Sequence, residues 1–279
     1  MSFQPVIPLS GNSGWKFLQS TYDRQLSTHA NSPQIKADRA YLTEKLSEPM
    51  TTESFLNDKR LLRVAMAAFD LGGEEWKRGF VDKVLKEAAT PGSTFLARLN
   101  NPKYTAFAEA FKPVNGKITV SPEAIDKIAA DFDEASFETA VGRVDDSMRI
   151  ALNFKSEISE LVGSGTSSDT AILYRMLGNI PVRTLLETAL NLPSEIRKLD
   201  IDKQASLVKA GLQQRFGITD LKDLTDPAVV DKIISRYHTM ESIKSGAANY
   251  SPAANALTLL NGGVGLGGQA GINLLLSGL

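Results

Sequence analysis

Apolar residues recur at spacings of three and four along most of the chain, the pattern of helices with one buried face. Lys117–Val120, which follows Asn115-Gly116, is the strand candidate, as one arm of a small hairpin. A lone strand makes no sheet, so the pattern predicts an all-α fold. Besides one longer helix described below, it predicts helices over Trp15–Thr28, Gln34–Leu46, Asp58–Leu71, Glu74–Glu87, Asp169–Leu177, Pro181–Leu190, Asp202–Phe216 and Pro227–Met240.

Several helix starts carry a capping residue followed by proline. The capping side chain accepts a hydrogen bond from an unpaired backbone N–H, and proline at the first helical position loses no donor that the helix would use. The pattern therefore fixes where these helices begin. The pairs are Ser32-Pro33, Asn101-Pro102, Ser121-Pro122, Asp226-Pro227 and Ser251-Pro252.

One helix is expected to be unusually long. From Ser121 to Gly163 the apolar stripe continues without a proline, and Gly142 is the glycine inside it. Some 40 residues at ~1.5 Å each would span roughly 60 Å, more than the diameter of a small domain. We therefore expect a central helix that joins two helical units. The stripe slips phase at Asp133–Ser136, which is where a break is expected if there is one.

Two blocks of sequence follow the same order and suggest an internal duplication. Asp58–Leu71 is followed by Val81-Asp82-Lys83 and by Asn101-Pro102, and Ile180–Leu192 is followed by Ile201-Asp202-Lys203 and by Asp226-Pro227. The alternative is that amphipathic helices simply resemble one another. The expected organisation is a first helical unit over residues 1–120, a connecting helix over 121–163, a second helical unit over 164–244 and a tail over 245–279.

Composition narrows the classes of function. The 279 residues are 42% hydrophobic and 23% charged, with a formal net charge of −1. A protein that binds nucleic acid neutralises phosphates with a basic surplus, which this chain lacks, so no nucleic-acid partner is expected. The absence of cysteine excludes disulfides and thiolate metal sites. Met1–Gly14 contains no basic residue, so no cleavable secretory signal is predicted, and no stretch predicts an integral membrane span.

The motifs that could carry chemistry are weak. Gly263-Val-Gly265-Leu-Gly-Gly268 matches the dinucleotide fingerprint in letters, but no helix and no acidic residue follow at the required distances. His29 and His238 have no ligand or triad pattern around them. The acidic clusters predict solvated helix faces. We therefore predict no catalytic residue, no cofactor and no metal site. The aromatics on the helix stripes are predicted to be core: Phe55, Phe69, Phe80, Phe95, Phe107 and Phe111.

The tail is the candidate interaction segment. From Ser245 to Leu279 there is no charged residue, and the last part is apolar but rich in glycine. Exposed apolar side chains gain free energy on burial, whereas glycines make ordering costly, so the tail is expected to associate with other proteins or with a second copy. The alternative is a tail that folds back and fills a groove. The candidate interaction residues are Leu257, Leu259, Leu260, Leu274, Leu275 and Leu276.

Several strings resemble one bacterial family, catalogued as domain of unknown function 1217. The resemblance rests on Pro8–Gln19, Asp58–Leu71, Leu190–Pro193 and Leu199–Gln204, and it extends to about Tyr237. It implies a gene setting among flagellar genes of motile bacteria, and it implies no activity, cofactor or catalytic residue. Where such proteins often have Phe-Gly-Leu, this chain has Phe69-Asp-Leu71. Asp70 is then expected either to adopt a left-handed turn or to mark a different turn.

These observations favour a non-enzymatic, flagellum-associated protein with a structural or assembly-assisting role. Its expected partners are other proteins, flagellar components or a second copy of the chain, and its expected location is cytoplasmic or flagellum-associated. Two alternatives stay open. One is an export chaperone or regulator that remains in the cytoplasm, although such binders tend to be smaller and acidic. The other is a hydrolase whose site carries no recognisable motif.

Overall fold

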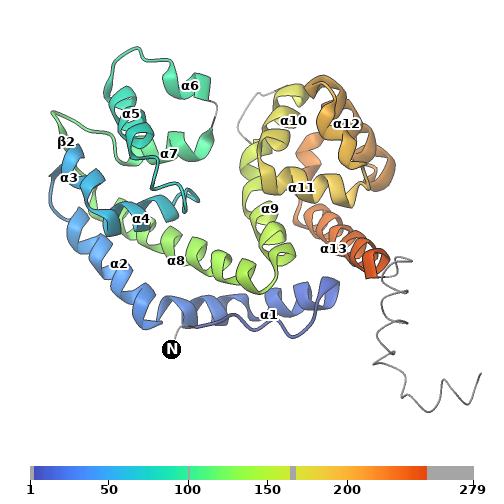
Figure 1. The fold of residues 1–279 in the computed structure, drawn as a ribbon. Coiled ribbons are helices and arrows are strands. Elements are labelled where there is room, and N and C mark those ends of the chain that lie inside the picture. The colour runs from blue at the N-terminus through green and yellow to red at the C-terminus, as the bar shows by residue number, and fades with distance from the viewer. Residues whose placement is uncertain (1–2, 100, 164–167, 250–279) are drawn as a thin grey trace, which may run out of the picture. The chain divides into compact units, whose positions relative to one another are not determined.

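The computed structural model describes residues 3–99, 101–163 and 168–249, and their fold is all-α as predicted (Figure 1). Two short 3-10 helices, Ser194–Lys198 and Leu221–Thr225, accompany the α-helices. The α-helices are α1 Gly11–Ala30, α2 Pro33–Leu46, α3 Thr52–Asn57, α4 Lys59–Ala67, α5 Arg78–Ala89, α6 Phe95–Leu99, α7 Pro102–Ala110, α8 Pro122–Val144, α9 Asp146–Gly163, α10 Asp169–Gly178, α11 Ile180–Ala189, α12 Ile201–Phe216 and α13 Pro227–Asn249.

The strand candidate lies in a minimal antiparallel pair. Strand β2, Lys117–Ile118, pairs with β1, Met50–Thr51, in the register Met50 to Ile118. An isolated bridge joins Val114 to Lys117 across Asn115-Gly116, whose φ angles of 51° and 77° are typical of a tight hairpin turn. The hairpin is thus present, but its strand pairs mainly with a distant partner.

The single long helix predicted from Ser121 to Gly163 is wrong. The chain forms α8 and α9, separated by Asp145, whose φ of −151° and ψ of 107° are extended. Asp145 ends one helix and begins the next, because its carboxylate accepts from the Ser147 N–H at 2.9 Å and the Ser147 hydroxyl at 2.6 Å. Gly142 leaves room for the side chain of Arg149, whose Cδ would lie 2.4 Å from a Cβ there. The suspected break at Asp133–Ser136 is absent.

The predicted unit boundaries need the same correction. The chain divides into two compact units, Met1–Leu152 and Asn153–Leu279. Helix α8 packs against α1, α2 and α4, so it belongs to the first unit and is not a free connector. Ile158 and Leu161 of α9 are buried, and α9 continues into the second unit. The predicted tail starts too early, since α13 runs to Asn249.

The core of the first unit is rich in phenylalanine. Phe55, Phe107 and Phe111 are fully buried, and the Phe55 and Phe111 ring centroids lie 4.9 Å apart. The other predicted core aromatics, Phe69, Phe80 and Phe95, are partly buried against the same cluster. In the second unit the core includes the buried faces of α10, α11, α12 and α13, among them Leu173, Leu186, Val208 and Ile234.

Helices α4 and α11 begin and end in the same way. Asp58 ends α3 and caps α4 by accepting from the Leu61 N–H at 2.9 Å, and Asn179 ends α10 and caps α11 by accepting from the Val182 N–H at 3.2 Å. Twelve residues after each cap comes a left-handed residue, Asp70 with φ 54° or Asn191 with φ 53°. Helix α3 contacts α4 and α5, as α10 contacts α11 and α12.

Each unit also buries one carboxylate between two arginines. In the first unit Asp38 accepts from Arg60 and Arg63, each at 2.8 Å, and its side chain is 1% exposed. In the second unit Glu187 accepts from Arg183 and Arg197, each at 2.7 Å, and its side chain is 9% exposed. A carboxylate at this depth requires such partners, because the desolvated charge is costly without them.

Candidate protein-binding surface

The connection between α4 and α5 begins with a left-handed turn. The Leu71 N–H donates to the Met66 carbonyl oxygen at 2.9 Å, which closes the end of α4, and Asp70 has a φ of 54°. This confirms the first of the two alternatives for Asp70, which adopts the conformation that glycine favours. Lys103 Nζ lies 3.4 Å from the Asp70 carboxylate. The chain leaves α4 in a defined direction toward Gly72 and Gly73.

Glu74 anchors this connection to the body of the unit. Its N–H donates to the Leu71 carbonyl oxygen at 3.1 Å, and its carboxylate accepts from the Tyr104 hydroxyl and from Lys77 Nζ, the latter at 2.9 Å. The Tyr104 hydrogen bond, with the charge of Lys77, lowers the pKa of Glu74. Burial, with the Glu74 charge, raises the pKa of Tyr104. Glu74 therefore stays ionised at neutral pH and holds the turn against α7.

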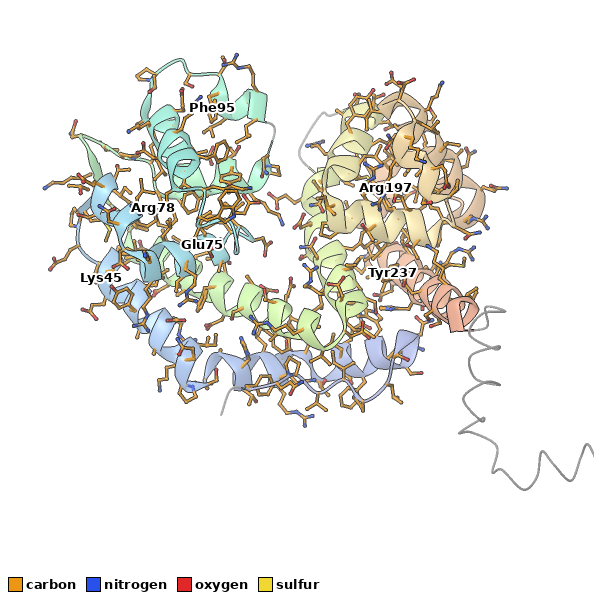
Figure 2. All side chains as sticks on the ribbon, viewed as in Figure 1. Lys45, Glu75, Arg78, Phe95, Arg197 and Tyr237 are labelled. Carbon is orange, nitrogen blue, oxygen red and sulfur yellow. The ribbon has the colours of Figure 1, made fainter. Side chains whose placement is uncertain are left out.

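Trp76 stands on this anchored turn with 77% of its surface exposed. The Lys77 N–H donates to the Glu74 carbonyl oxygen at 2.9 Å, and Lys77 Nζ lies 5.5 Å from the Trp76 ring centroid. Figure 2 labels two neighbours, Glu75 and Arg78, on this stretch of chain. Trp15, the other tryptophan, is 3% exposed. An exposed tryptophan on a fixed turn is a suitable anchor for a partner protein, since tryptophan is enriched in binding hot spots.

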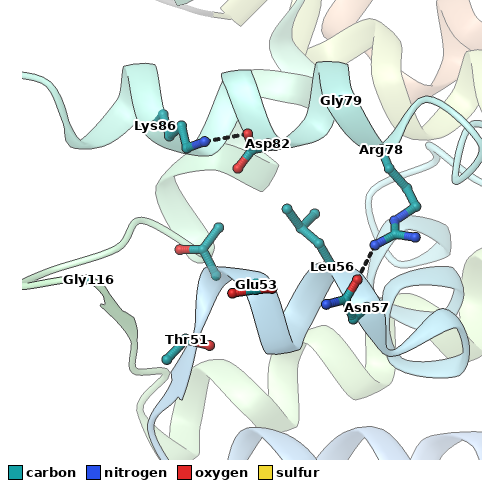
Figure 3. A pocket seen from close by; sticks show the side chains of 10 residues that line it. Thr51, Glu53, Leu56, Asn57, Arg78, Gly79, Asp82, Lys86 and Gly116 are labelled. Atoms are coloured by element: carbon teal, nitrogen blue, oxygen red, sulfur yellow. Dashed lines mark hydrogen bonds and ion pairs between the residues drawn. The ribbon is translucent and has the colours of Figure 1, made fainter.

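Next to this turn lies a shallow depression between α3, α5 and the β2 turn. Its volume is about 640 Å³, and Figure 3 shows Leu56 pointing into it. On its wall Arg78 donates to the Asn57 side-chain oxygen, and Lys86 pairs with Asp82 at 2.6 Å. The depression holds no acid–base pair aimed at a common point. It adds an uneven, mixed polar surface at the start of α5, the helix that follows the turn.

His29 lies beside a serine, the arrangement that the hydrolase alternative requires. His29 Nε2 and Ser136 Oγ are 3.0 Å apart, but Ser136 donates its proton to the Asp133 carbonyl oxygen at 2.9 Å. Ser136 therefore accepts from His29, the reverse of base activation. Burial, assisted by the charge of Arg143, lowers the pKa of His29. Among the described residues His29 Nδ1 has no hydrogen-bond partner, so the orienting carboxylate of a triad is missing there.

The remaining predicted sites are placed as follows. His238 is fully buried in α13 beside Tyr237, with ring centroids 5.1 Å apart. In the described part of the chain no group of three or more acidic or histidine side chains is arranged to hold a metal ion. Nor does any helix there combine the length and apolarity needed to cross a membrane. The glycines of the dinucleotide-like string and the six candidate leucines lie outside the described residues: Leu257, Leu259, Leu260, Leu274, Leu275 and Leu276.

Comparison with known proteins identifies the family and the fold. The model of the family described as "Protein of unknown function (DUF1217)" matches residues 68–230, more than half of the chain. The chain belongs to this family. Its fold is similar to the crystal structure of protein AGR_C_984 from Agrobacterium tumefaciens, with a TM-score of 0.66 and 21% identity over 86% of this chain and 99% of that chain. No curated protein matches the chain.

Proposed function

We propose that the protein is a non-enzymatic, flagellum-associated protein that binds other proteins in a structural or assembly-assisting role. The observation that carries the binding role is Trp76, which is exposed on a turn anchored by Glu74. The flagellar setting rests on the resemblance of its sequence strings to a family encoded among flagellar genes. The direction of the Ser136 hydrogen bond gives the hydrolase alternative no support.

The energetics of Trp76 favour a binding role. A tryptophan side chain buries ~150–250 Å² when covered, and at ~25 cal/mol per Å² this contributes roughly 4–6 kcal/mol before the costs of association. Those costs include the ordering of the groups at the interface. The turn that carries Trp76 is already held by Glu74, Tyr104 and Lys77, which reduces that cost. The six tail leucines remain a second candidate interaction segment of this same role.

The same proposal includes an internal duplication. The shared caps, the left-handed residues Asp70 and Asn191, and the matching contacts of α3 and α10 support descent from one helical unit. The common register pairs Leu61 with Val182, Val64 with Leu185 and Ala65 with Leu186. These pairs are buried in both units.

The location of the protein in motile cells tests the flagellar role. We expect a large part of the cellular protein to co-purify with intact flagella and their basal structures, at a constant ratio to flagellar subunits across preparations. Quantitative mass spectrometry of the purified structures and of the cytoplasm measures this ratio. A matched preparation from non-flagellated cells is the control. Protein found wholly in the cytoplasm of motile cells would favour the chaperone or regulator alternative instead.

A further inference from the structure

The N-terminal segment, Phe3–Leu9, lies as an extended strap against helix α1. Figure 1 shows it running back alongside the helix that follows it. Pro5 is buried and Phe3 and Ile7 are partly buried, whereas Gln4, Val6 and Pro8 are exposed. This alternation is that of an extended chain with one face on a surface. The strap has no charged residue.

Gln25 holds the strap by its backbone. Its side-chain oxygen accepts from the Val6 N–H at 2.7 Å, and its side-chain nitrogen donates to the Val6 carbonyl oxygen at 3.1 Å. The same nitrogen donates to the Thr21 hydroxyl at 2.8 Å, and Thr21 donates to the Phe17 carbonyl oxygen at 2.8 Å. Thr21 thus fixes the orientation of the amide. Gln25 is 7% exposed, and its side-chain amide binds both backbone polar groups of one residue, Val6.

The strap is preordered by its prolines. Pro5 and Pro8 fix their own φ angles and restrict Gln4 and Ile7 to extended conformations. Neither proline has an N–H that could donate to α1. Val6, which lies between them, supplies both a donor and an acceptor at the middle of the strap. At its start, Phe3 packs against His29 with ring centroids 5.8 Å apart. This is the manner in which grooves recognise proline-containing segments of other proteins, with little ordering entropy to lose.

Glycines make the reversal between strap and helix. Gly11 has a φ of 61°, and a Cβ on Gly14 would lie 1.9 Å from the Leu9 carbonyl oxygen. Such a distance excludes any side chain at Gly14 while the strap is in place. We call the surface of α1 along Gly14, Gln25 and His29, on which the strap lies, the groove of α1. A single methyl group at Gly14 would block the turn that brings the strap onto this groove.

We propose that the groove of α1 is a binding site for an extended, uncharged segment of a partner protein with proline between apolar residues, and that the strap is its internal competitor. This inference rests on the proposed protein-binding role. The seated strap defines the chemistry of the occupant, because it shows which groups the groove satisfies: the backbone N–H and C=O of one residue at Gln25, a proline beside it and an aromatic ring at His29. A partner segment binds when the strap is displaced.

The test opens the groove in the full chain. In Gly14→Ala the new methyl group displaces Leu9 and with it the strap. The matched control is Gly79→Ala, a helical glycine of the same unit with open space around its Cβ position. The probe is a fluorescein-labelled peptide with the sequence of residues 2–8 and an amidated end, which lacks the Leu9 carbonyl group that the new methyl group excludes, and fluorescence anisotropy measures its affinity. We expect Gly14→Ala to bind the peptide at least tenfold more tightly than the wild type and Gly79→Ala do.

Two further variants make the result specific. Gln25→Ala in the Gly14→Ala background should remove the gain, and a peptide methylated on the Val6 nitrogen should bind no variant. Should Gly14→Ala fail to fold, Pro5→Asp displaces the strap without altering α1 and should give the same gain. Equal, weak binding of the peptide to folded wild type and to a folded opened variant would overturn the proposal. A stable dimer of the opened variant would also overturn it, because the groove would then bind a second copy of the chain. The peptide-binding result does not depend on whether the protein co-purifies with flagella, so the two proposals can fail separately.

Discussion

Leu62→Ala and Leu186→Ala are each expected to lower the free energy of unfolding by about 2–5 kcal/mol. Both side chains are 1% exposed, Leu62 in the phenylalanine-rich core of the first unit and Leu186 in the core of the second. The loss combines the transfer free energy of the removed methyl groups with the cavity left behind. Urea denaturation followed by circular dichroism measures it.

Matched leucines on the surface serve as controls for these variants. Leu207 and Leu199 are each 41% exposed, so Leu207→Ala and Leu199→Ala should change the unfolding free energy by less than about 1 kcal/mol. A loss below about 1 kcal/mol in both core variants would contradict the assignment of the buried faces of α4 and α11. A large loss in one variant alone would confine the error to the other unit.

The double variant Arg60→Ala/Arg63→Ala is expected to cost about 3–5 kcal/mol at pH 7, because it leaves the buried Asp38 carboxylate without a cation. Burial by itself raises the pKa of Asp38, but hydrogen bonds from Arg63, Gln34 and Arg60 outweigh it and hold the pKa below its usual value. In the double variant Gln34 remains, at 3.1 Å from Oδ2. A single neutral donor does not replace two guanidinium groups.

The sign of the pH dependence follows from these two states of Asp38. In the wild type the folded pKa is lowered, so the contribution of Asp38 is present above the unfolded pKa of about 3.9 and is lost as pH falls through the folded value. In the double variant burial raises the folded pKa, so stability is lost as pH rises above about 4. The difference in unfolding free energy should therefore be largest near neutral pH and shrink below about pH 4.

Two exposed ion pairs provide the control for the Arg60→Ala/Arg63→Ala variant. Lys86 and Lys127 pair with acids one helical turn away and are 69% and 76% exposed. Lys86→Ala/Lys127→Ala should cost about 1–2 kcal/mol at most in total, with a weak pH dependence. An Arg60→Ala/Arg63→Ala variant that behaves like this control would contradict a stabilising role of the buried network.

Local signals in the sequence were sufficient to predict the helices but not the breaks and turns between them. Proline after a capping residue located the starts of α2, α7, α8 and α13, because this signal lies in adjacent residues, although the Ser32 side chain makes no capping hydrogen bond at the start of α2. The fifth pair, Ser251-Pro252, lies outside the described residues. The break at Asp145 was missed, since the apolar stripe continues across it, although Asp-Asp-Ser is itself a helix-start pattern. Trp76 was assigned to a helix beginning at Glu74, yet Glu74–Lys77 forms the turn that exposes it.

The features that matter most for binding depend on distant pairs. Gln25 meets Val6 across 19 residues, Glu74 meets Tyr104 across 30 and His29 meets Ser136 across 107. Periodicity and composition carry no information about such pairs, which is why neither the strap nor the anchored turn could be predicted. The left-handed Asp70 could be anticipated, because the family pattern that this string resembles has glycine at that place, and few residues other than glycine, asparagine and aspartate tolerate that conformation.

We propose that Trp76 anchors the protein on a flagellar partner. The most direct measurement compares the amounts of wild type, Trp76→Ala and Val114→Ala that co-purify with flagella from motile cells. Val114 is 64% exposed in the same unit, which makes it the matched control. We expect Trp76→Ala to reduce the co-purifying amount at least about tenfold with an unchanged melting temperature, while Val114→Ala has no effect. Equal co-purification of all three proteins would contradict the claim.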